Sequence, residues 1–188
     1  PGLATVVVTA LFLNLLHQMG GVFISLYGLA VGMTLTQIGV LRAAYAGVNA
    51  ITRPISGHVV NKVGHRGLSY AGIPLQSALL MLIPLFSGFG PILIVYVLSG
   101  LMRAIVIVAN AVGLVQDVDE TKVQRGIASA VYNSAGDVGN IIGPSIGGII
   151  AHATSIAAVF VYGSLGSTIL FLLVIFAVRR SAGMNYKS

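Results

Sequence analysis

Six long apolar stretches, separated by short polar breaks, make up most of the chain. They cover residues about 3–29, 36–61, 67–87, 91–115, 124–151 and 155–178, and each approaches or exceeds the ~20 residues that a helix needs to cross hydrocarbon. Strands are excluded, because these stretches are too long and backbone groups in lipid must be satisfied within a helix or a closed barrel. We therefore expect an all-α membrane protein, with six transmembrane helices forming a single bundle over residues 1–188.

The composition excludes soluble classes of protein. Charged residues make up 7% of the chain and hydrophobic residues 56%, whereas a soluble domain carries about 25% charged residues. A soluble enzyme or a nucleic-acid reader is therefore excluded, despite a formal net charge of +6. Cysteine is absent, which excludes disulfides and thiolate metal sites. We expect no cofactor and no metal, and no phosphate-binding loop for ATP is present. Because the chain begins with Pro1, we expect a segment of a longer polypeptide.

Of the connections between the stretches, only alternate ones carry Lys or Arg, and so does the segment after the last stretch. These basic residues are Lys62, Arg66, Lys122, Arg125, Arg179, Arg180 and Lys187. By the positive-inside rule, these connections and both ends of the segment are cytoplasmic. We expect a multi-pass protein of the plasma or inner membrane.

Polar residues follow one face of four of the stretches. In the first stretch, Asn14, His17 and Gln18 have the i, i+3, i+4 spacing of one helical face. Because polar groups in lipid are costly, such faces indicate either a wet, substrate-facing surface or hydrogen bonds between helices. The residues that we expect to contact the substrate or a coupling ion are Asn14, His17, Gln18, Asn49, Arg103, Asn110, Asn133 and Asp137.

The third and sixth stretches lack such a face, so the pattern polar, polar, apolar occurs twice. This predicts two three-helix repeats, as in transporters built from inverted repeats. Arg103 and Asp137 lie at nearly equal depth, roughly 18 and 20 Å from the cytoplasmic ends of their helices. We expect them to form an ion pair, direct or through water, which is either a fixed structural pair or one in which Asp137 exchanges Arg103 for a proton or the substrate. Arg42 and Arg53 lie nearer the helix ends, and their side chains can reach an interface.

Small residues recur at every fourth position of the fifth stretch. Gly139, Gly143 and Gly147 are part of this series, which lets another helix approach closely. Pro144 removes a backbone donor and bends the helix. The polar face of the stretch lies opposite, which favours a moving interface beside a cavity over a static helix pair. The run 143–147 also matches the G-x-S-x-G pattern of a serine nucleophile elbow. We reject this match, because the elbow requires a strand-to-helix turn and this run lies inside an apolar helix.

Two motifs resemble those of the major facilitator superfamily. Residues 57–66 read GHVVNKVGHR and resemble the family's G-x-x-x-D-R/K-x-G-R/H-R loop. Residues 139–148 read GNIIGPSIGG and resemble its G-x-x-x-G-P-x-x-G-G motif, and Arg103 is placed like the family's fourth-helix arginine. The matching loop positions are Gly57, Asn61, Lys62, Gly64 and Arg66, and those of the helix-packing motif are Gly139, Gly143, Pro144, Gly147 and Gly148.

The resemblance implies one half of a twelve-helix fold that transports a small organic solute by alternating access. The implied partners are the lipid bilayer, the missing six-helix half, the solute and protons. The implied activity is proton-coupled efflux or uptake, by an antiporter or a symporter. No enzymatic activity is expected. The loop would be a cytoplasmic gate, with uncharged Asn61 where the family has an acid. Asn61 and the basic tail favour the C-terminal half, whereas the motif at 139–148 favours the N-terminal half; we expect the former. The alternatives are an intramembrane protease or a non-transporting protein of the same fold.

Overall fold

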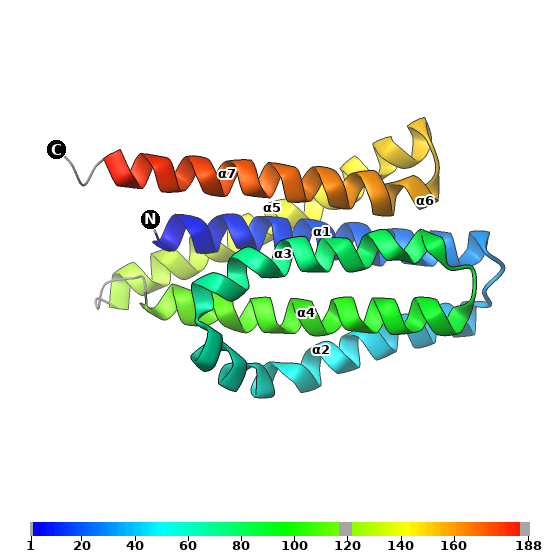
Figure 1. Ribbon diagram of the computed structural model, residues 1–188, viewed down its shortest axis with the longest axis horizontal. Coiled ribbons are helices and arrows are strands. Elements are labelled where there is room, and N and C mark those ends of the chain that lie inside the picture. Colours follow the sequence, from blue (N-terminus) through cyan, green and yellow to red (C-terminus); the bar gives the residue numbers. More distant parts are fainter. Residues whose placement is uncertain (1, 117–121, 185–188) are drawn as a thin grey trace.

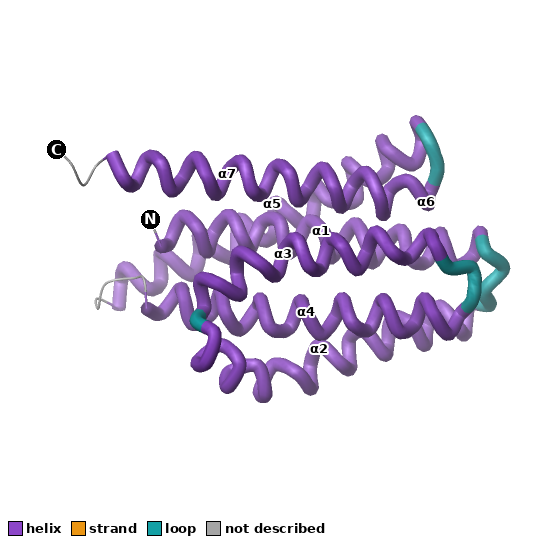
Figure 2. The backbone as a smooth tube through the Cα atoms, viewed as in Figure 1, coloured by secondary structure: helices purple, strands orange, loops and turns teal. Residues whose placement is uncertain are grey.

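Long helices run back and forth along one axis in the computed structural model, which describes residues 2–116 and 122–184 (Figure 1). The long helices are α1 (Gly2–Ala30), α2 (Leu35–Val63), α3 (His65–Leu82), α4 (Phe89–Gln116), α5 (Lys122–Ala153) and α7 (Ser164–Met184). A 3-10 turn, η1 (Ile83–Leu85), extends α3. The short α6 (Ile156–Ala158) and the π-helical turn η2 (Val159–Gly163) lead into α7. These residues contain no strand (Figure 2), so the all-helical prediction is confirmed for this part of the chain.

Four segments of the described chain are long and apolar enough to cross a membrane: Leu3–Ala30, His65–Leu85, Phe89–Gln116 and Ile156–Val178. The helices α2 and α5 are not among them, although they have 29 and 32 residues and would extend about 43 and 48 Å. Their hydropathy is lower because α2 carries Arg42 and Arg53, and α5 carries Asp137 and many glycines. Six membrane-spanning helices therefore stay a prediction.

Both described ends of the chain lie at the same end of the bundle (Figure 1). The connection from α2 to α3, centred on Gly64, and the end of α4 lie there too. This end carries the exposed basic side chains of Lys62, Arg66 and Arg180. The other predicted basic side chains, of Lys122, Arg125, Arg179 and Lys187, lie outside those that the structure describes.

Local signals fix the two turns around α2. The backbone N–H of Gln37 donates to Thr34 Oγ1 at 3.2 Å, and the N–H of Thr34 donates to Gln37 Oε1 at 2.9 Å. This capping box satisfies backbone donors at the start of the helix. At the other end, Gly64 has a φ of 90°, a left-handed conformation that glycine adopts without steric cost.

Aromatic side chains connect α1 to the later helices. Phe12 packs edge-on against Phe171 of α7, with ring centroids 5.6 Å apart, and Tyr27 packs in the same way against Phe160 of η2 at 5.8 Å. The Tyr27 hydroxyl also donates to the carbonyl oxygen of Phe86 at 3.0 Å, beyond η1. The helix α1 is thereby held in the middle of the bundle.

The closest helix pair is α1 with α5, and glycines of α5 make that contact possible. A Cβ atom at Gly139 would overlap the carbonyl oxygen of Leu11, and one at Gly143 would overlap that of Leu15. Gly147 faces the ring of Phe23 in the same way. These three glycines are buried against α1, so the two backbones lie directly on each other.

Candidate functional site

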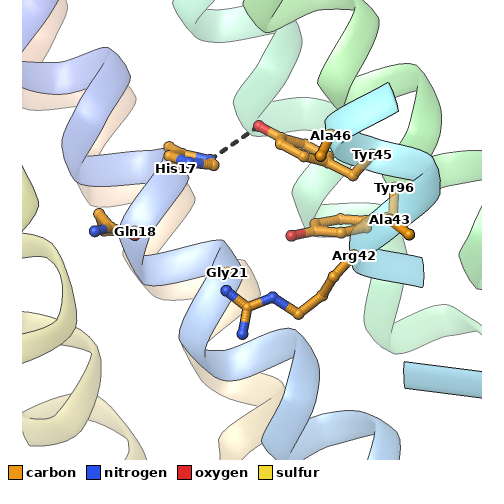
Figure 3. A pocket seen from close by; sticks show the side chains of 8 residues that line it. All are labelled: His17, Gln18, Gly21, Arg42, Ala43, Tyr45, Ala46 and Tyr96. Carbon is orange, nitrogen blue, oxygen red and sulfur yellow. Dashed lines mark hydrogen bonds between the residues drawn. The ribbon is translucent and has the colours of Figure 1, made fainter. Parts of the chain in front are cut away.

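Two adjoining cavities lie between α1, α2 and α4. The first has a volume of about 410 Å³ (Figure 3). Its polar lining comes from His17 and Gln18 of α1, Arg42 and Tyr45 of α2 and Tyr96 of α4. The three helices thus bring polar side chains from distant parts of the sequence to one space.

The second cavity has a volume of about 280 Å³ and shares His17, Tyr45 and Ala46 with the first. Asn49 and Arg53 of α2 line it further along the same helix, together with Arg103 of α4. The residues that α2 contributes to both cavities follow helical spacing, so one face of α2 forms a continuous wall. They are Arg42, Ala43, Tyr45, Ala46, Asn49, Ala50 and Arg53.

Three stacked rings line the first cavity, and two of them, His17 and Tyr45, also line the second. His17 and Tyr45 lie with ring centroids 5.4 Å apart and planes 12° from parallel, and Tyr45 and Tyr96 lie 4.6 Å apart at 25°. His17 Nδ1 and the Tyr45 hydroxyl are hydrogen-bonded at 3.0 Å (Figure 3). This bond and the stacking join α1, α2 and α4 through one row of side chains.

Asn49 connects α2 to α4 and orients Arg53. Its Nδ2 donates to the carbonyl oxygen of Gly100 at 3.1 Å, and the side chain is buried. Its Oδ1 accepts from Nε and Nη2 of Arg53 at 3.1 and 2.8 Å. Because both ends of the amide are engaged, Asn49 holds the Arg53 guanidinium at the wall of the second cavity.

Arg103 is buried and hydrogen-bonds to α1. Its Nη1 donates to the carbonyl oxygen of Leu13 and its Nη2 to Oδ1 of Asn14, each at 3.0 Å. The Asn14 amide is held in turn, because its Nδ2 donates to the carbonyl oxygen of Ala10 at 2.9 Å. A buried guanidinium in the middle of α4 is thus bound by neutral oxygens.

The predicted direct ion pair between Arg103 and Asp137 is wrong. The carboxylate of Asp137 is exposed on α5, whereas the guanidinium of Arg103 is bound by α1. The prediction assumed that consecutive antiparallel helices are neighbours. Instead α5 packs along α1, where a Cβ at Gly136 would lie 2.8 Å from Nδ2 of Asn14.

The structure places the remaining predicted residues outside the cavities. Asn110 is buried and accepts a hydrogen bond from Ser69 Oγ of α3 at 2.9 Å, so it contributes to helix packing. Asn133 is exposed on α5, as Asp137 is. The loop residues Asn61, Lys62, Gly64 and Arg66 are exposed at the end of the bundle, and Gly57 is half-buried nearby.

Two further residues of α5 that belong to sequence motifs, Gly148 and Ser145, also lie outside the two cavities. Gly148 of the glycine-rich motif has open space where a Cβ would be, unlike Gly147 next to it. Ser145, the serine of the G-x-S-x-G match, donates to the carbonyl oxygen of Ile141 at 3.0 Å within the helix. That geometry is a helical backbone contact and not a strand-to-helix nucleophile elbow.

Tyr45, Tyr96, Arg42 and Arg53 were missing from the predicted site. Their helical spacing with Asn49 was a usable signal for the three residues of α2, and Tyr96 lies seven residues before Arg103, on the same face of α4. Arg42 and Arg53 are exposed side chains that line the cavities, and their reach to a membrane interface stays a prediction.

The arrangement is suited to binding rather than catalysis. The cavity walls offer guanidinium, amide, imidazole and phenol groups within a largely apolar bundle, which is the usual composition of a small-molecule site. The described residues contain no group of three or more His, Cys, Asp or Glu side chains that could hold a metal ion.

Comparison with known proteins places the chain among membrane transporters. The family model of the Major Facilitator Superfamily matches residues 6–187. Quinolone resistance protein NorA of Staphylococcus aureus (strain MRSA252) is 29% identical over 138 residues, which are 72% of this chain and 34% of NorA. Staphylopine export protein of Staphylococcus aureus (strain Mu50 / ATCC 700699) is 26% identical over 180 residues, 94% of this chain and 44% of that protein. The matches thus cover less than half the length of these curated relatives.

Proposed function

Because this chain belongs to the Major Facilitator Superfamily, we propose that it forms one half of a secondary transporter that moves a small organic solute across a membrane by alternating access. At the level of the family, the protein is a transporter and not an enzyme. The observation that carries the proposal is the pair of polar cavities between α1, α2 and α4. Polar and charged side chains within membrane helices are costly and mark substrate pathways.

The packing of the helices supports two inverted three-helix repeats. The first triplet of long helices is α1, α2 and α3, and the second is α4, α5 and α7. The first helix of each triplet packs most closely against the second helix of the other, α1 with α5 and α4 with α2. A pseudo-two-fold axis that relates two repeats would produce this reciprocal pairing of first and second helices. A second six-helix half would then cover the cavities. That this chain is the C-terminal half stays a prediction.

The end of the bundle that carries Lys62, Arg66 and Arg180 is proposed to be cytoplasmic. Both described ends of the chain lie there (Figure 1). The exposed loop around Gly64 would close against the other half as a gate. Asn61 can hydrogen-bond in that contact but cannot form an ion pair.

Export is the proposed direction, because the two relatives are named for quinolone resistance and for staphylopine export. Asp137 is the proposed proton carrier. Its carboxylate is exposed on α5, and Arg103 does not neutralise it directly. It also lies away from the glycine face of the helix, which is occupied by α1. A carboxylate in that position can exchange protons when the transporter opens.

The test is transport by the intact polypeptide reconstituted in liposomes. A quinolone and staphylopine are the probes, and a proton gradient is imposed across the bilayer. We expect at least one probe to accumulate against its gradient and the accumulation to collapse when an uncoupler is added. Asp137→Asn should abolish accumulation, whereas Arg180→Gln, at the end of the bundle, should not. Failure to accumulate either probe would contradict export of these compounds.

A further inference from the structure

We propose that the transported solute carries a negatively charged group, and that the first cavity binds this group through Arg42. This inference rests on the proposed function and names the substrate class of the same site. The observation behind it is an imbalance of charge, because guanidinium groups line the cavities and carboxylates do not.

The two cavities contain Arg42, Arg53 and Arg103. Asp137 is the only acidic residue in the described part of the chain, and it lines neither cavity. The hydrogen-bond acceptors of Arg53 and Arg103 are amide and carbonyl oxygens, which orient a guanidinium but do not neutralise it. The cavities therefore keep a positive potential that a bound anion would balance.

The position of the arginines strengthens this potential. Arg42 lies about two turns into α2, and Arg103 lies near the middle of α4. Arg103 is buried, whereas Arg42 is an exposed side chain at the first cavity. Charges interact more strongly in buried surroundings than in water, so the unbalanced guanidinium of Arg103 adds to the attraction that Arg42 exerts on an anionic occupant.

Arg42 has the geometry to hold that anion. Figure 3 shows its guanidinium extending from α2 toward α1 at Gly21. A Cβ at Gly21 would meet nothing within 4 Å, so the space in front of the guanidinium is open. The Tyr96 hydroxyl points to the same side, and Gln18 lies on the opposite wall (Figure 3). A planar guanidinium binds a carboxylate through two parallel hydrogen bonds, and hydroxyl and amide groups can add further donors.

The competing explanation is a carboxylate supplied by the other half of the transporter. Such a group would neutralise Arg42 permanently and leave the cavity without an anion preference. The two explanations differ in the electrostatic potential that a small reagent meets inside the first cavity of the intact protein.

That potential can be measured at Ala46, which lines both cavities. The chain contains no cysteine, so Ala46→Cys introduces a single thiol once any cysteine elsewhere in the intact polypeptide is replaced. The reagents are the anionic sulfonatoethyl and the cationic trimethylammonioethyl methanethiosulfonates. Each forms a disulfide with the thiolate and releases methanesulfinate. The rate at which each reagent modifies the protein thiol is divided by its rate with free 2-mercaptoethanol, which corrects for the different intrinsic reactivities of the two reagents.

We expect the normalised rate of the anionic reagent to exceed that of the cationic reagent by about tenfold or more. Adding Arg42→Gln should reduce this ratio several-fold, while Arg42→Lys should retain it because the charge remains. Arg180→Gln removes an arginine at the end of the bundle and should leave the ratio unchanged. A ratio near one, or no reaction with either reagent, would overturn the proposal.

A second arm tests the ligand class, with the neutral methyl methanethiosulfonate as the reagent. The competitors are 2-naphthoate and 2-naphthylmethylamine, which have the same ring system and opposite charges. We expect naphthoate to slow modification of the introduced thiol, and Arg42→Gln to abolish this protection. Equal or better protection by the amine would overturn an anionic substrate. Accumulation in liposomes is measured separately, so a transporter of cations would contradict this inference and leave the proposed function standing.

Discussion

Asn14 of α1 and Arg103 of α4 are joined by a hydrogen bond of 3.0 Å between Asn14 Oδ1 and Arg103 Nη2. The same guanidinium donates to the carbonyl oxygen of Leu13 at 3.0 Å, so two acceptors on consecutive residues of α1 bind one arginine. The contact joins the first helix of each three-helix group at the middle of the bundle. It satisfies a buried cation without an acidic partner, which leaves Asp137 available for other chemistry.

Arg103→Lys should destabilise the fold although it keeps the charge. A lysine ammonium cannot reproduce the planar fork that reaches both acceptors, and losing one buried charge-assisted hydrogen bond costs about 1.5–3 kcal/mol. The measurement is a thermal unfolding curve of the intact protein in detergent. Arg180→Lys, at an exposed position, is the control and should leave the Tm unchanged. An unchanged Tm for Arg103→Lys would show that the fork contributes no stability.

Two glycine-to-alanine substitutions on α5 should differ in their effect on the free energy of unfolding. Gly139→Ala places a methyl group against the carbonyl oxygen of Leu11, so α1 and α5 must separate. Overpacking of this kind costs about 1–3 kcal/mol. Gly148→Ala meets open space within this chain and should be neutral or stabilise the helix by up to about 1 kcal/mol. Chemical unfolding of the two variants side by side measures the difference. Equal stabilities would contradict the close backbone contact.

The hydroxyl groups of the two stacked tyrosines should differ in importance for stability. Tyr45→Phe removes the hydrogen bond to His17 and keeps the ring stack, which should cost about 1 kcal/mol. The structure gives the Tyr96 hydroxyl no hydrogen bond to a described residue, so Tyr96→Phe should change stability by less than about 0.5 kcal/mol. Thermal unfolding of both variants tests this. A larger loss for Tyr96→Phe would mean that its hydroxyl has a structural partner.

Asp137→Asn should separate folding from transport. Because the carboxylate is exposed and has no direct bond to Arg103, the variant should unfold within about 0.5 kcal/mol of the natural protein. Proton-driven accumulation in liposomes should nevertheless be lost. Strong destabilisation would instead indicate that Asp137 has a structural partner in the rest of the polypeptide.

The sequence predicted the helices because the requirement to satisfy backbone groups in lipid leaves few choices. The stretch predicted at about 91–115, for example, is part of α4 (Phe89–Gln116). The four-residue spacing of Gly139, Gly143 and Gly147 also indicated the face that contacts another helix. Gly148 was included through the motif rather than the spacing, and it lies about 100° around the helix from Gly147.

The composition of the site was harder to predict because it depends on which helices are neighbours. Periodicity identifies a polar face but not the helix that meets it. The partner of Arg103 was therefore assigned to the next helix, α5, whereas α1 provides it. Tyr96 lies seven residues before Arg103 on the same helical face, but periodicity could not show that it stacks on Tyr45 across α2 and α4.

The direct contact between the backbones of α1 and α5 limits how this bundle can deform. Where Gly139 and Gly143 lie against the main chain of α1, no side chain is present that could change rotamer and absorb a shift. We therefore expect α1 and α5 to move together as one rigid body. The contact between α1 and α2 is made instead by the side chains of His17 and Tyr45, so these two helices are where bending is expected.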